Sequence, residues 1–511
     1  MEKTGFISTT IPYVNARPHL GHALEFVETD AYARFMRTKL DDVFFLTGSD
    51  ENALKNVLAA EAAGMSTADL VARNALAFQD LQSALLCAPD HFVRTSVDPL
   101  HLAGATELWR RMEAAGDLYP RAYEGLYCVG CEQFYEPAEL ADGRCPEHLT
   151  EPERVREQNW FFRLSRYQDD LLKCLESGAL VIHPETRRNE VISFVRAGLQ
   201  DISVSRSATR ARGWGIPVPG DDSQVMYVWI DALTNYTNAL GWTADDPRYQ
   251  RFWADATQRV HVMGKGVIRF HAVYWPAMLL SAGLPLPTDL VVHGYITAGG
   301  RKLGKSLGNA VDPEDLIDRY GARAVRYALL ATFAPFGDGD VTEERIVAAY
   351  NTDLANGLGN LVSRVTSMIA RYRGGVVPFG SVAGGLGEAV GVAAGAVDAA
   401  MTGYDHRLAV QHLNTLVGQA NAYVDEHAPW HLAKNPEDAD RLDTCLLHIA
   451  GAVRALAALL RPFLPDAAEE ILVALNQPAD WRLGGDWLAG MAGTAVQKPA
   501  AIFPRIDAPA T

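Results

Sequence analysis

Two histidines lie three residues apart near the start of the chain, in the stretch IPYVNARPHLGHALEFVETD. His19 and His22 follow Pro18 and flank Gly21, directly after an apolar run. If Pro18 and His19 open a helix, its first turn presents backbone N–H groups and the positive end of the helix dipole. The two imidazoles add donors and Gly21 lets a ligand approach the backbone, so the stretch is suited to phosphate oxygens. Alone, the H-x-x-H pattern is also compatible with chance or with a metal-binding pair.

A second candidate for phosphate chemistry is the glycine- and lysine-rich stretch GGRKLGKSLGN at residues 299–309. It carries Lys302, Lys305 and Ser306 and follows an apolar run of strand length. Glycines supply backbone freedom and lysines supply positive charge, which together predict a loop that closes on phosphates. A solvated basic turn is the alternative for this stretch by itself. The presence of the two histidines in the same chain favours the phosphate interpretation.

Four residues between 128 and 148 have the spacing of a metal site. Cys128 and Cys131 form one C-x2-C pair, and Cys145 and His148 form a second pair thirteen residues further on. Three thiolates and one imidazole predict a closed tetrahedral zinc site without an open coordination position, and therefore a structural one. Such a zinc would hold together an insert that is too small for its own core. The alternative is four reduced, unconnected side chains.

Periodicity predicts the elements that position these residues. Residues 5–11 and 41–50 are apolar runs of strand length, and residues 19–37 between them have the pattern of an amphipathic helix. This strand–helix–strand order is typical of a parallel α/β unit. Helical patterns continue over 51–64, 67–86 and 101–115.

The periodicity breaks at 116–149, which contains the cysteine pairs and is interpreted as an insertion. Three further runs of strand length follow it, SQVMYVWID, RVHVMG and DLVVHGYIT, so a Rossmann-type parallel sheet is expected to be split by the insert. From about 342 onward we expect a helical bundle, interrupted by a Gly/Ala-rich segment near 380–400. The expected domains are 1–115 and 206–290 for the two halves of the Rossmann domain, 116–205 for the inserted connective domain, 291–341 for the linking region and 342–511 for the helical domain.

Composition excludes several protein classes. The chain has 511 residues, 48% of them hydrophobic and 21% charged, which is typical of a globular protein of about three domains. Its start lacks the form of a signal peptide, and no run approaches the roughly 20 apolar residues of a membrane span, so a cytoplasmic protein without membrane contact is expected. A net charge of −16 argues against a general nucleic-acid coat, so a polyanion must be bound by a specific surface.

The stretches HLGH and KLGKS resemble the two signature elements of class I aminoacyl-tRNA synthetases. The methionyl-tRNA synthetase family is the closer resemblance, because similar stretches occur along nearly the whole chain. These include PYVNARPHLGH, YEGLYCVGCEQFY, RNEV, SVSR, RGWGIPVPGD, YVWIDAL, FHAVYWPAML, VHGYIT, KSLGN and APW. The resemblance implies a ligase that activates methionine with Mg²⁺-ATP and transfers it to the terminal ribose of tRNA(Met), for protein synthesis including initiation.

The resemblance also implies residue roles. Methionine would be bound by Ile11, Tyr13, Asp50, Trp229, Ala232, Tyr236, Val267 and His271. Asp50 would hold the ammonium group, and Tyr13 and His271 would be the polar contacts to the thioether. His19, Gly21, His22, Lys302, Lys305 and Ser306 would contact ATP, with the two histidines and two lysines catalytic. Core packing is the alternative for Trp229, Tyr236 and His271.

In the helical part, Asn356, Asn360 and Arg364 follow one another at i+4 steps, and APWHL supplies Trp430. The resemblance implies that these residues read the anticodon, since Asn and Arg can bond base edges and an exposed Trp can stack on a base. Helix packing and a core tryptophan are the alternative. The chain ends at Thr511 without the further β-barrel that makes some relatives dimers, so a monomer is expected.

The chain departs from the family pattern at four positions. Leu303 and Gly304 replace a Met and a Ser in the lysine loop, Asn52 stands where relatives have His, and Gly266 stands where an acidic ATP contact is common. Two other hypotheses stay open, the first of them because of Gly304, Asn52 and Gly266. One is a tRNA-binding paralogue with weakened catalysis, and the other is an enzyme that adenylates an amino acid without tRNA.

Overall fold

The computed structural model of the chain describes residues 2–129, 133–135, 137–146, 149–298, 301–302 and 311–507. The chain forms two compact units. The first contains Met1–Thr29, Met36–Ser83 and Cys87–Gly294, and the second contains Asp30–Phe35, Ala84–Leu86 and Tyr295–Thr511. Each unit is a folded body with its own core, and helix α1 contributes residues to both.

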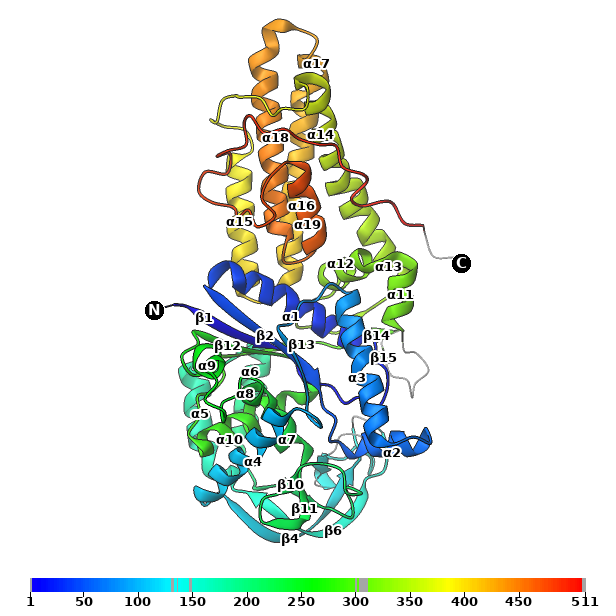
Figure 1. The fold of residues 1–511 in the computed structure, drawn as a ribbon, viewed down its shortest axis with the longest axis vertical. Helices are drawn as coiled ribbons and strands as arrows, with labels where there is room; N and C mark the ends of the chain where they lie inside the picture. The colour runs from blue at the N-terminus through cyan, green and yellow to red at the C-terminus, as the bar shows by residue number, and fades with distance from the viewer. Residues whose placement is uncertain are drawn as a thin grey trace. The chain divides into compact units, whose positions relative to one another are not determined.

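A six-stranded parallel sheet is the centre of the first unit (Figure 1). Its strand order is β3 (His91–Arg94), β2 (Asp42–Ser49), β1 (Thr4–Ser8), β12 (Gln258–Gly264), β13 (Asp289–His293) and β7 (Val181–His183). The strands of such a sheet are covered on both faces, which explains their continuous apolar runs. The strand order reverses between β1 and β12, and ligands of open α/β sheets bind beyond the carboxyl ends of the strands at this point.

The helices that follow the strands agree with the predicted periodicity. They are α1 (Leu20–Lys39), α2 (Leu54–Ala62), α3 (Thr67–Ala84) and α4 (Pro99–Ala114). Helix α10 (Trp275–Ala282), for which no range was predicted, lies between β12 and β13. Shorter turns of helix are α7 (Val228–Leu233), α8 (Asn235–Asn238), α9 (Pro247–Tyr249), η3 (Gln250–Ala254), η4 (Lys265–Val267) and η5 (Phe270–Tyr274). Of these, η3 and η5 are π-helical. The short helices matter most here, because they carry the candidate methionine-binding residues.

The residues between α4 and Val204, apart from β7, form a separate region built on an antiparallel sheet. In it β4 (Leu118–Cys128) pairs with β6 (Glu153–Phe162), flanked by β5 (Gln133–Tyr135) and β8 (Ile202–Ser203). The turns η1 (Pro137–Glu139) and η2 (Leu164–Tyr167) and the helices α5 (Gln168–Ser177) and α6 (Glu185–Arg196) complete the region. Strand β7 pairs with β13 of the central sheet, although it lies inside the 116–205 range expected to be inserted.

One predicted strand is wrong in part. The run SQVMYVWID was expected to belong to the parallel sheet, but β11 (Asp221–Met226) pairs antiparallel with β9 (Ser205–Ser207) and β10 (Pro217–Val218). The chain then turns into the helix α7 at Val228. All six α7 residues are buried. A short apolar run that is buried on every side has the same pattern as a helix or as a strand.

The second unit is helical after a small sheet of β14 (Ile296–Ala298), β15 (Arg301–Lys302) and β16 (Gly339–Asp340). Its helices are α11 (Pro313–Tyr320), α12 (Ala322–Thr332), α13 (Glu343–Ala349), the π-helix η7 (Tyr350–Gly359), α14 (Asn360–Arg373), α15 (Gly387–Thr402), α16 (His406–His427), α17 (Pro429–Leu432), η8 (Pro436–Asp438), α18 (Ala439–Leu460) and α19 (Pro465–Ala474). Within this unit α14, α15 and α16 pack along α18 (Figure 1).

The Gly/Ala-rich segment expected to interrupt the bundle is largely helix, because α15 covers 387–402. Its buried residues Val390, Ala393, Val397, Ala400 and Met401 follow helical spacing and face the other helices. Packing of this face outweighs the weak helix propensity of the glycines.

Helix α18 departs from the expectation that no segment is apolar enough to span a membrane. The helical stretch Pro436–Leu460 is long and apolar enough by length and composition, with a mean hydropathy of 1.5 in its most apolar window. However, 78% of that window is buried inside the protein, as in the core helix of a bundle. The stretch is therefore weak evidence for a membrane span.

Candidate active site and RNA-binding surface

The two signature histidines form the cap of helix α1. His19 is the N-cap residue, and its Nδ1 accepts a hydrogen bond from the backbone N–H of Gly21 at 3.1 Å. His22 Nδ1 accepts in turn from the backbone N–H of His19 at 3.1 Å, and the two rings stack with centroids 3.8 Å apart. These two N–H groups are therefore bonded to the imidazoles. The prediction was that the first-turn N–H groups would be available to a ligand. Because each Nδ1 accepts, each neutral ring carries its proton on Nε2, where it can donate to an anion.

Gly21 has a structural role beside its predicted contact with a ligand. A Cβ atom at this position would lie 2.9 Å from Cε1 and 3.0 Å from Nδ1 of His19. Contacts this short displace one of the partners. The glycine is therefore required by the position of the His19 ring, whatever ligand approaches the backbone.

A buried ion pair that sequence reasoning missed lies at the carboxyl edge of the same sheet. Glu25 on α1 accepts hydrogen bonds from the N–H of Thr10 at 2.8 Å and from His293 Nε2 at 3.0 Å. His293 also donates from Nδ1 to the carbonyl of Gly294 at 2.8 Å, so both ring nitrogens are donors and the ring is an imidazolium. The only sequence signal for His293 was that it lies in VHGYIT, one of the stretches that resemble the family.

The pKa values of this pair move in opposite directions. Burial alone would lower the pKa of His293, but the hydrogen bond to Glu25 and the charges of Glu28 and Glu25 raise it to about 9. Burial alone would raise the pKa of Glu25, but His293 and the two donors of Thr10 hold it below its ordinary value. Both groups are therefore charged at neutral pH.

The segments after β1 and β2 bring two predicted methionine-binding residues together. Tyr13 and Asp50 form an isolated parallel bridge, and the backbone N–H of Asp50 donates to the carbonyl of Pro12 at 2.9 Å. Asp50 is 1% exposed. Ile11 and Tyr13 pack against the core cluster that includes Trp229 and Tyr236.

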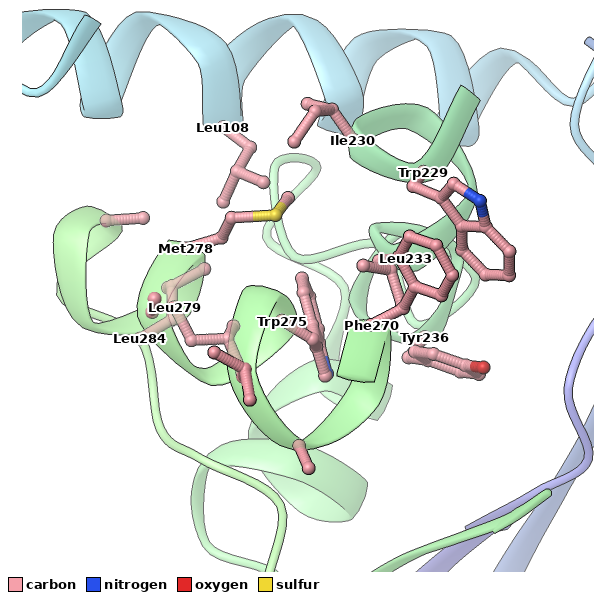
Figure 2. Close-up of a cluster of buried hydrophobic side chains, with 14 of the residues drawn as sticks. Leu108, Trp229, Ile230, Leu233, Tyr236, Phe270, Trp275, Met278, Leu279 and Leu284 are labelled. Atoms are coloured by element: carbon pink, nitrogen blue, oxygen red, sulfur yellow. The ribbon is translucent and has the colours of Figure 1, made fainter. Parts of the chain in front are cut away.

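Aromatic rings from three short helices form the wall next to these segments. Trp229 of α7 stacks on Phe270 of η5 with centroids 3.8 Å apart, and Tyr13 meets Trp229 edge to face. Figure 2 shows Trp229, Phe270 and Tyr236 close together on one side of the buried cluster, with Met278 and Leu279 on the other. Ala232 lies on α7 and is buried, and Val267 packs against the cluster. The structure thus gathers the side chains predicted to contact the methionine side chain.

Hydrogen bonds define the protonation of His271. Its Nδ1 lies 3.0 Å from the carbonyl of Val267 and therefore donates, while Nε2 accepts from the hydroxyl of Tyr236 at 2.7 Å. Burial lowers the pKa of His271 to about 4 and raises that of Tyr236. Both groups are therefore neutral at neutral pH, which suits a wall that contacts an uncharged thioether.

Asn52, one of the departures from the family pattern, has a partner behind this wall. Its side-chain amide donates to Asp231 Oδ2 at 2.7 Å, and His101 Nε2 lies 2.5 Å from Asp231 Oδ1. Asp231 and His101 are both buried. Asn52 therefore ties the loop after β2 to α7. Asp231 and His101 are positioning residues that sequence reasoning missed.

The structure describes one of the two predicted loop lysines. Lys302 lies in β15, which pairs antiparallel with β14 and aligns Lys302 with Thr297. Lys305 and Ser306, together with Leu303 and Gly304, lie outside the described residues. Gly266 lies in η4, between β12 and η5.

Two of the four predicted zinc ligands are described. Cys128 ends β4, and together with Cys145 and Tyr135 it forms a small buried cluster. Cys145 Sγ lies 3.5 Å from the hydroxyl of Tyr135, and Cys128 Sγ lies 3.8 Å from Thr150 Oγ1. Cys131 and His148 lie outside the described residues. No group of three or more possible metal ligands occurs among the residues that are described.

The predicted anticodon residues lie in the second unit. Arg364 on α14 donates to Asp425 at 2.6 Å, and its guanidinium is 5.9 Å from the centre of the Trp430 ring. Trp430 is 37% exposed, so it is not a core residue. Asn356 on η7 and Asn360 at the start of α14 are both exposed and line one groove.

Comparisons with known proteins agree with this arrangement. Residues 5–154 and 135–366 match the family described as tRNA synthetases class I (M), and residues 379–510 match the anticodon binding domain of methionyl tRNA ligase. The chain is 42% identical to a methionine–tRNA ligase of Mesorhizobium japonicum, over 98% of this chain and 97% of the relative. It is 43% identical to one of Mycobacterium tuberculosis over 99% of each chain. A solved structure of Mycobacterium tuberculosis methionyl-tRNA synthetase in complex with methionyl-adenylate superimposes with a TM-score of 0.91, 42% identity and coverage of 98% of this chain and 100% of that one.

Proposed function

We propose specific roles for the residues of this chain, which belongs to the class I methionyl-tRNA synthetases and is a methionine–tRNA ligase. One observation supports these roles best. The side chains of Tyr13, Trp229, Tyr236 and His271 gather near the carboxyl edge of the parallel sheet, where His19 and His22 cap α1. The hypotheses of a catalytically weakened paralogue and of a tRNA-independent enzyme have no comparable support.

The first step is the in-line attack of the methionine carboxylate on the α-phosphate of Mg²⁺-ATP, with pyrophosphate as the leaving group. Mg²⁺ neutralises charge on the phosphates when it is bound with ATP. His19 and His22 donate from Nε2 to oxygens that gain charge, and Lys302 and Lys305 approach the same phosphates from the loop. Each preorganised donor of this kind typically lowers the barrier by roughly 3 kcal/mol. Gly21 and Ser306 complete the ATP contacts.

Methionine is recognised mainly by shape. Ile11, Trp229, Ala232 and Val267 enclose the side chain, and Asp50 binds the ammonium group. A thioether is only a weak acceptor, so selection depends on polarizable contacts and on a donor near sulfur. The hydroxyl proton of Tyr236 is bonded to His271 Nε2 and the ring proton of His271 to the carbonyl of Val267. The pair therefore offers sulfur a neutral, polarizable contact without the cost of a buried charge, and Tyr13 is the candidate donor.

A structural zinc held by Cys128, Cys131, Cys145 and His148 fits the small buried cluster around Tyr135. Both described thiols are buried there, in a part of the insert whose core contains three residues. A metal that binds thiolates and imidazole contributes folding free energy to such a region.

The second step transfers the methionyl group from the adenylate to the terminal ribose hydroxyl of tRNA(Met), with AMP as the leaving group. Asn356, Asn360 and Arg364 bond base edges of the unpaired anticodon, and Trp430 stacks on one base. Since Arg364 lies beside the Trp430 ring, the two can hold the same nucleotide. The enzyme works as a monomer in the cytoplasm, where translation takes place.

ATP–pyrophosphate exchange with a panel of amino acids, followed by charging of purified initiator tRNA, tests this function. Exchange that depends on methionine and charging of initiator tRNA are both expected. Substitution Lys305→Ala should reduce the exchange rate by about two to three orders of magnitude with methionine affinity nearly kept. Exchange without charging would favour the tRNA-independent enzyme, and tRNA binding without exchange would favour the paralogue.

A further inference from the structure

The last residues of the second unit form a segment that crosses the helix carrying Asn356 and Asn360. Residues 497–506, here called the C-terminal strap, have no helix or strand among them. The strap and the helix together line a groove of about 580 Å³, with Asn356, Asn360 and Ser363 on one wall and Lys498 and Phe503 on the other. The groove thus joins two of the proposed anticodon residues to a lysine that has no assigned role.

Hydrogen bonds hold the strap at both ends. Before Lys498, the backbone N–H of Gln497 donates to the carbonyl of Ala474 at 2.8 Å. After it, Arg323 donates to the carbonyl of Ile502 at 2.7 Å, and Asn351 both donates to and accepts from the backbone of Ile506. The strap is therefore a fixed wall of the groove.

Apolar contacts place the strap close against the helix. Ile502 and Phe503 are 5% and 4% exposed, and Phe503 meets Tyr350 edge to face. A Cβ at Gly359 would lie 3.3 Å from the Phe503 ring and 3.0 Å from the carbonyl of Leu354. Gly359 thereby lets the strap approach the helix between Asn356 and Asn360.

The polar groups of the groove are suited to a nucleotide. Lys498 is exposed, and among the described residues it forms no salt bridge. Asn356 and Asn360 are exposed amides, which offer both donors and acceptors to a base edge. The protein carries a net charge of −16, so a polyanion must be bound at a local positive site, and the exposed ammonium of Lys498 beside two amides can form one. Asn360 and Arg364 lie one turn apart on α14, which connects the groove with the Arg364–Trp430 site.

We propose that this groove receives a nucleotide of the tRNA anticodon loop, with Lys498 bound to its phosphate. This inference rests on the proposed anticodon-reading role of the helical unit. A lysine on a phosphate contributes affinity without base information, whereas Asn356 and Asn360 read the base. The strap is thus a part of the RNA-binding surface that holds the loop in register.

Charging kinetics of four variants of the full-length protein test the proposal. Lys498→Ala should raise the KM for tRNA(Met) roughly fivefold, and Lys498→Glu should raise it further. Lys498→Arg keeps the positive charge and should have a KM near that of the original protein. The rise in KM should be the same for tRNAs with altered anticodons. The slope of log KM against log salt should become smaller by about one, as expected for the loss of one phosphate contact. Arg482→Glu, an exposed charge change elsewhere in the same unit, is the control and should leave the KM unchanged.

Adenylate formation separates this proposal from the function on which it rests. ATP–pyrophosphate exchange by the Lys498 variants should equal that of the original protein. Normal exchange with an unchanged KM for tRNA in Lys498→Glu would overturn the role of Lys498 and leave the ligase function intact. An equal rise of KM in Arg482→Glu would show a general charge effect and would also overturn it. If the unmodified protein neither exchanged nor charged, the proposed function itself would fail.

Discussion

Glu25 and His293 form an ion pair across 268 residues of sequence, with Oε2 of the carboxylate 3.0 Å from Nε2 of the ring. The pair fastens the start of α1, which carries the capped histidines, to the end of β13. Its burial makes the charges interact strongly and makes the loss of either one costly.

This pair predicts an alkaline loss of stability. The pKa of His293 rises from 6.5 to about 9 on folding, so the folded state binds more protons than the unfolded state between these values. The stabilisation is complete below pH 6.5 and disappears as the pH rises through 9. Its size is roughly 3 kcal/mol. Urea unfolding at several pH values between 6 and 10 measures it.

His293→Gln is the variant that tests the assignment, because it removes the titrating group. The free energy of unfolding of this variant should change much less between pH 6.5 and 9 than that of the original protein. An unchanged slope would assign the alkaline loss to another group. Glu25 contributes at the other end, since its lowered pKa gives stability above pH 4.5 that is lost as the pH falls.

A methyl group at position 21 should disturb catalysis through the His19 ring. Gly21→Ala places a Cβ 2.9 Å from that ring, which must then move away from His22. A displacement of a catalytic donor by about 1 Å typically costs up to 100-fold in rate. ATP–pyrophosphate exchange should fall by roughly this factor while the melting temperature changes little. Gly391→Ala, in open space on α15, is the control and should exchange normally.

The parts of the site that could be predicted are those encoded in neighbouring residues. The capped histidines and α1 follow from one short stretch, and the central strands follow from apolar runs bounded by loops. The network of Asn52, Asp231 and His101 joins residues that are 179 and 130 positions apart, which no local pattern reveals. The grouping of Trp229 with His271 came from the family resemblance, because aromatic spacing alone is equally typical of a core.

Three other features were not predicted, each for a different physical reason. The residues of α7 are buried on all sides, so the run has the pattern of a buried strand as well as that of a helix. The glycines of α15 suggested an interruption, but its regularly spaced buried residues make it a packed helix. The C-terminal strap has neither period, and its role follows only from what it packs against.

Removing the hydroxyl of Tyr236 should weaken the preference for the sulfur-containing side chain of methionine, because that hydroxyl orients the His271 ring. In Tyr236→Phe the ring remains in place, but His271 Nε2 loses its donor at 2.7 Å. An unpaired buried acceptor costs about 1 to 3 kcal/mol, and the KM for methionine should rise by roughly tenfold. The preference for methionine over norleucine, its methylene analogue, should narrow. An unchanged preference would make Tyr236 a packing residue, and the KM for ATP is the internal control.

Metal removal should act first on the insert. Cys145→Ala or chelation should unfold the region around 120–150 locally and reduce activity indirectly, because a small buried cluster cannot hold it alone. Metal analysis of protein purified without chelator should find about one zinc per chain. Cys445→Ala, a buried cysteine of α18, is the matched control and should keep its zinc. Protein that is active and free of zinc would contradict the structural site.

Trp430→Ala should separate the two half-reactions. Adenylate formation needs only methionine, ATP and magnesium, so exchange should stay near normal. Loss of a base stacked on an aromatic ring typically costs about 1 to 3 kcal/mol, which predicts a charging efficiency lower by roughly one to two orders of magnitude. The Trp430 ring is 37% exposed and lies 5.9 Å from the Arg364 guanidinium, so its loss should also reduce the hold of Arg364 on the same nucleotide.

The tRNA dependence of this variant distinguishes stacking from packing. Discrimination against tRNAs with other anticodons should weaken, because those tRNAs never had the full contact to lose, and Asn360→Ala and Arg364→Ala should relax base selection likewise. Phe379→Ala removes another exposed aromatic ring, 79% exposed, in the same unit and should charge normally. If Trp430→Ala charged its tRNA as well as the original protein but melted several degrees lower, the ring would serve packing, because a lost base contact cannot lower the stability of the free protein.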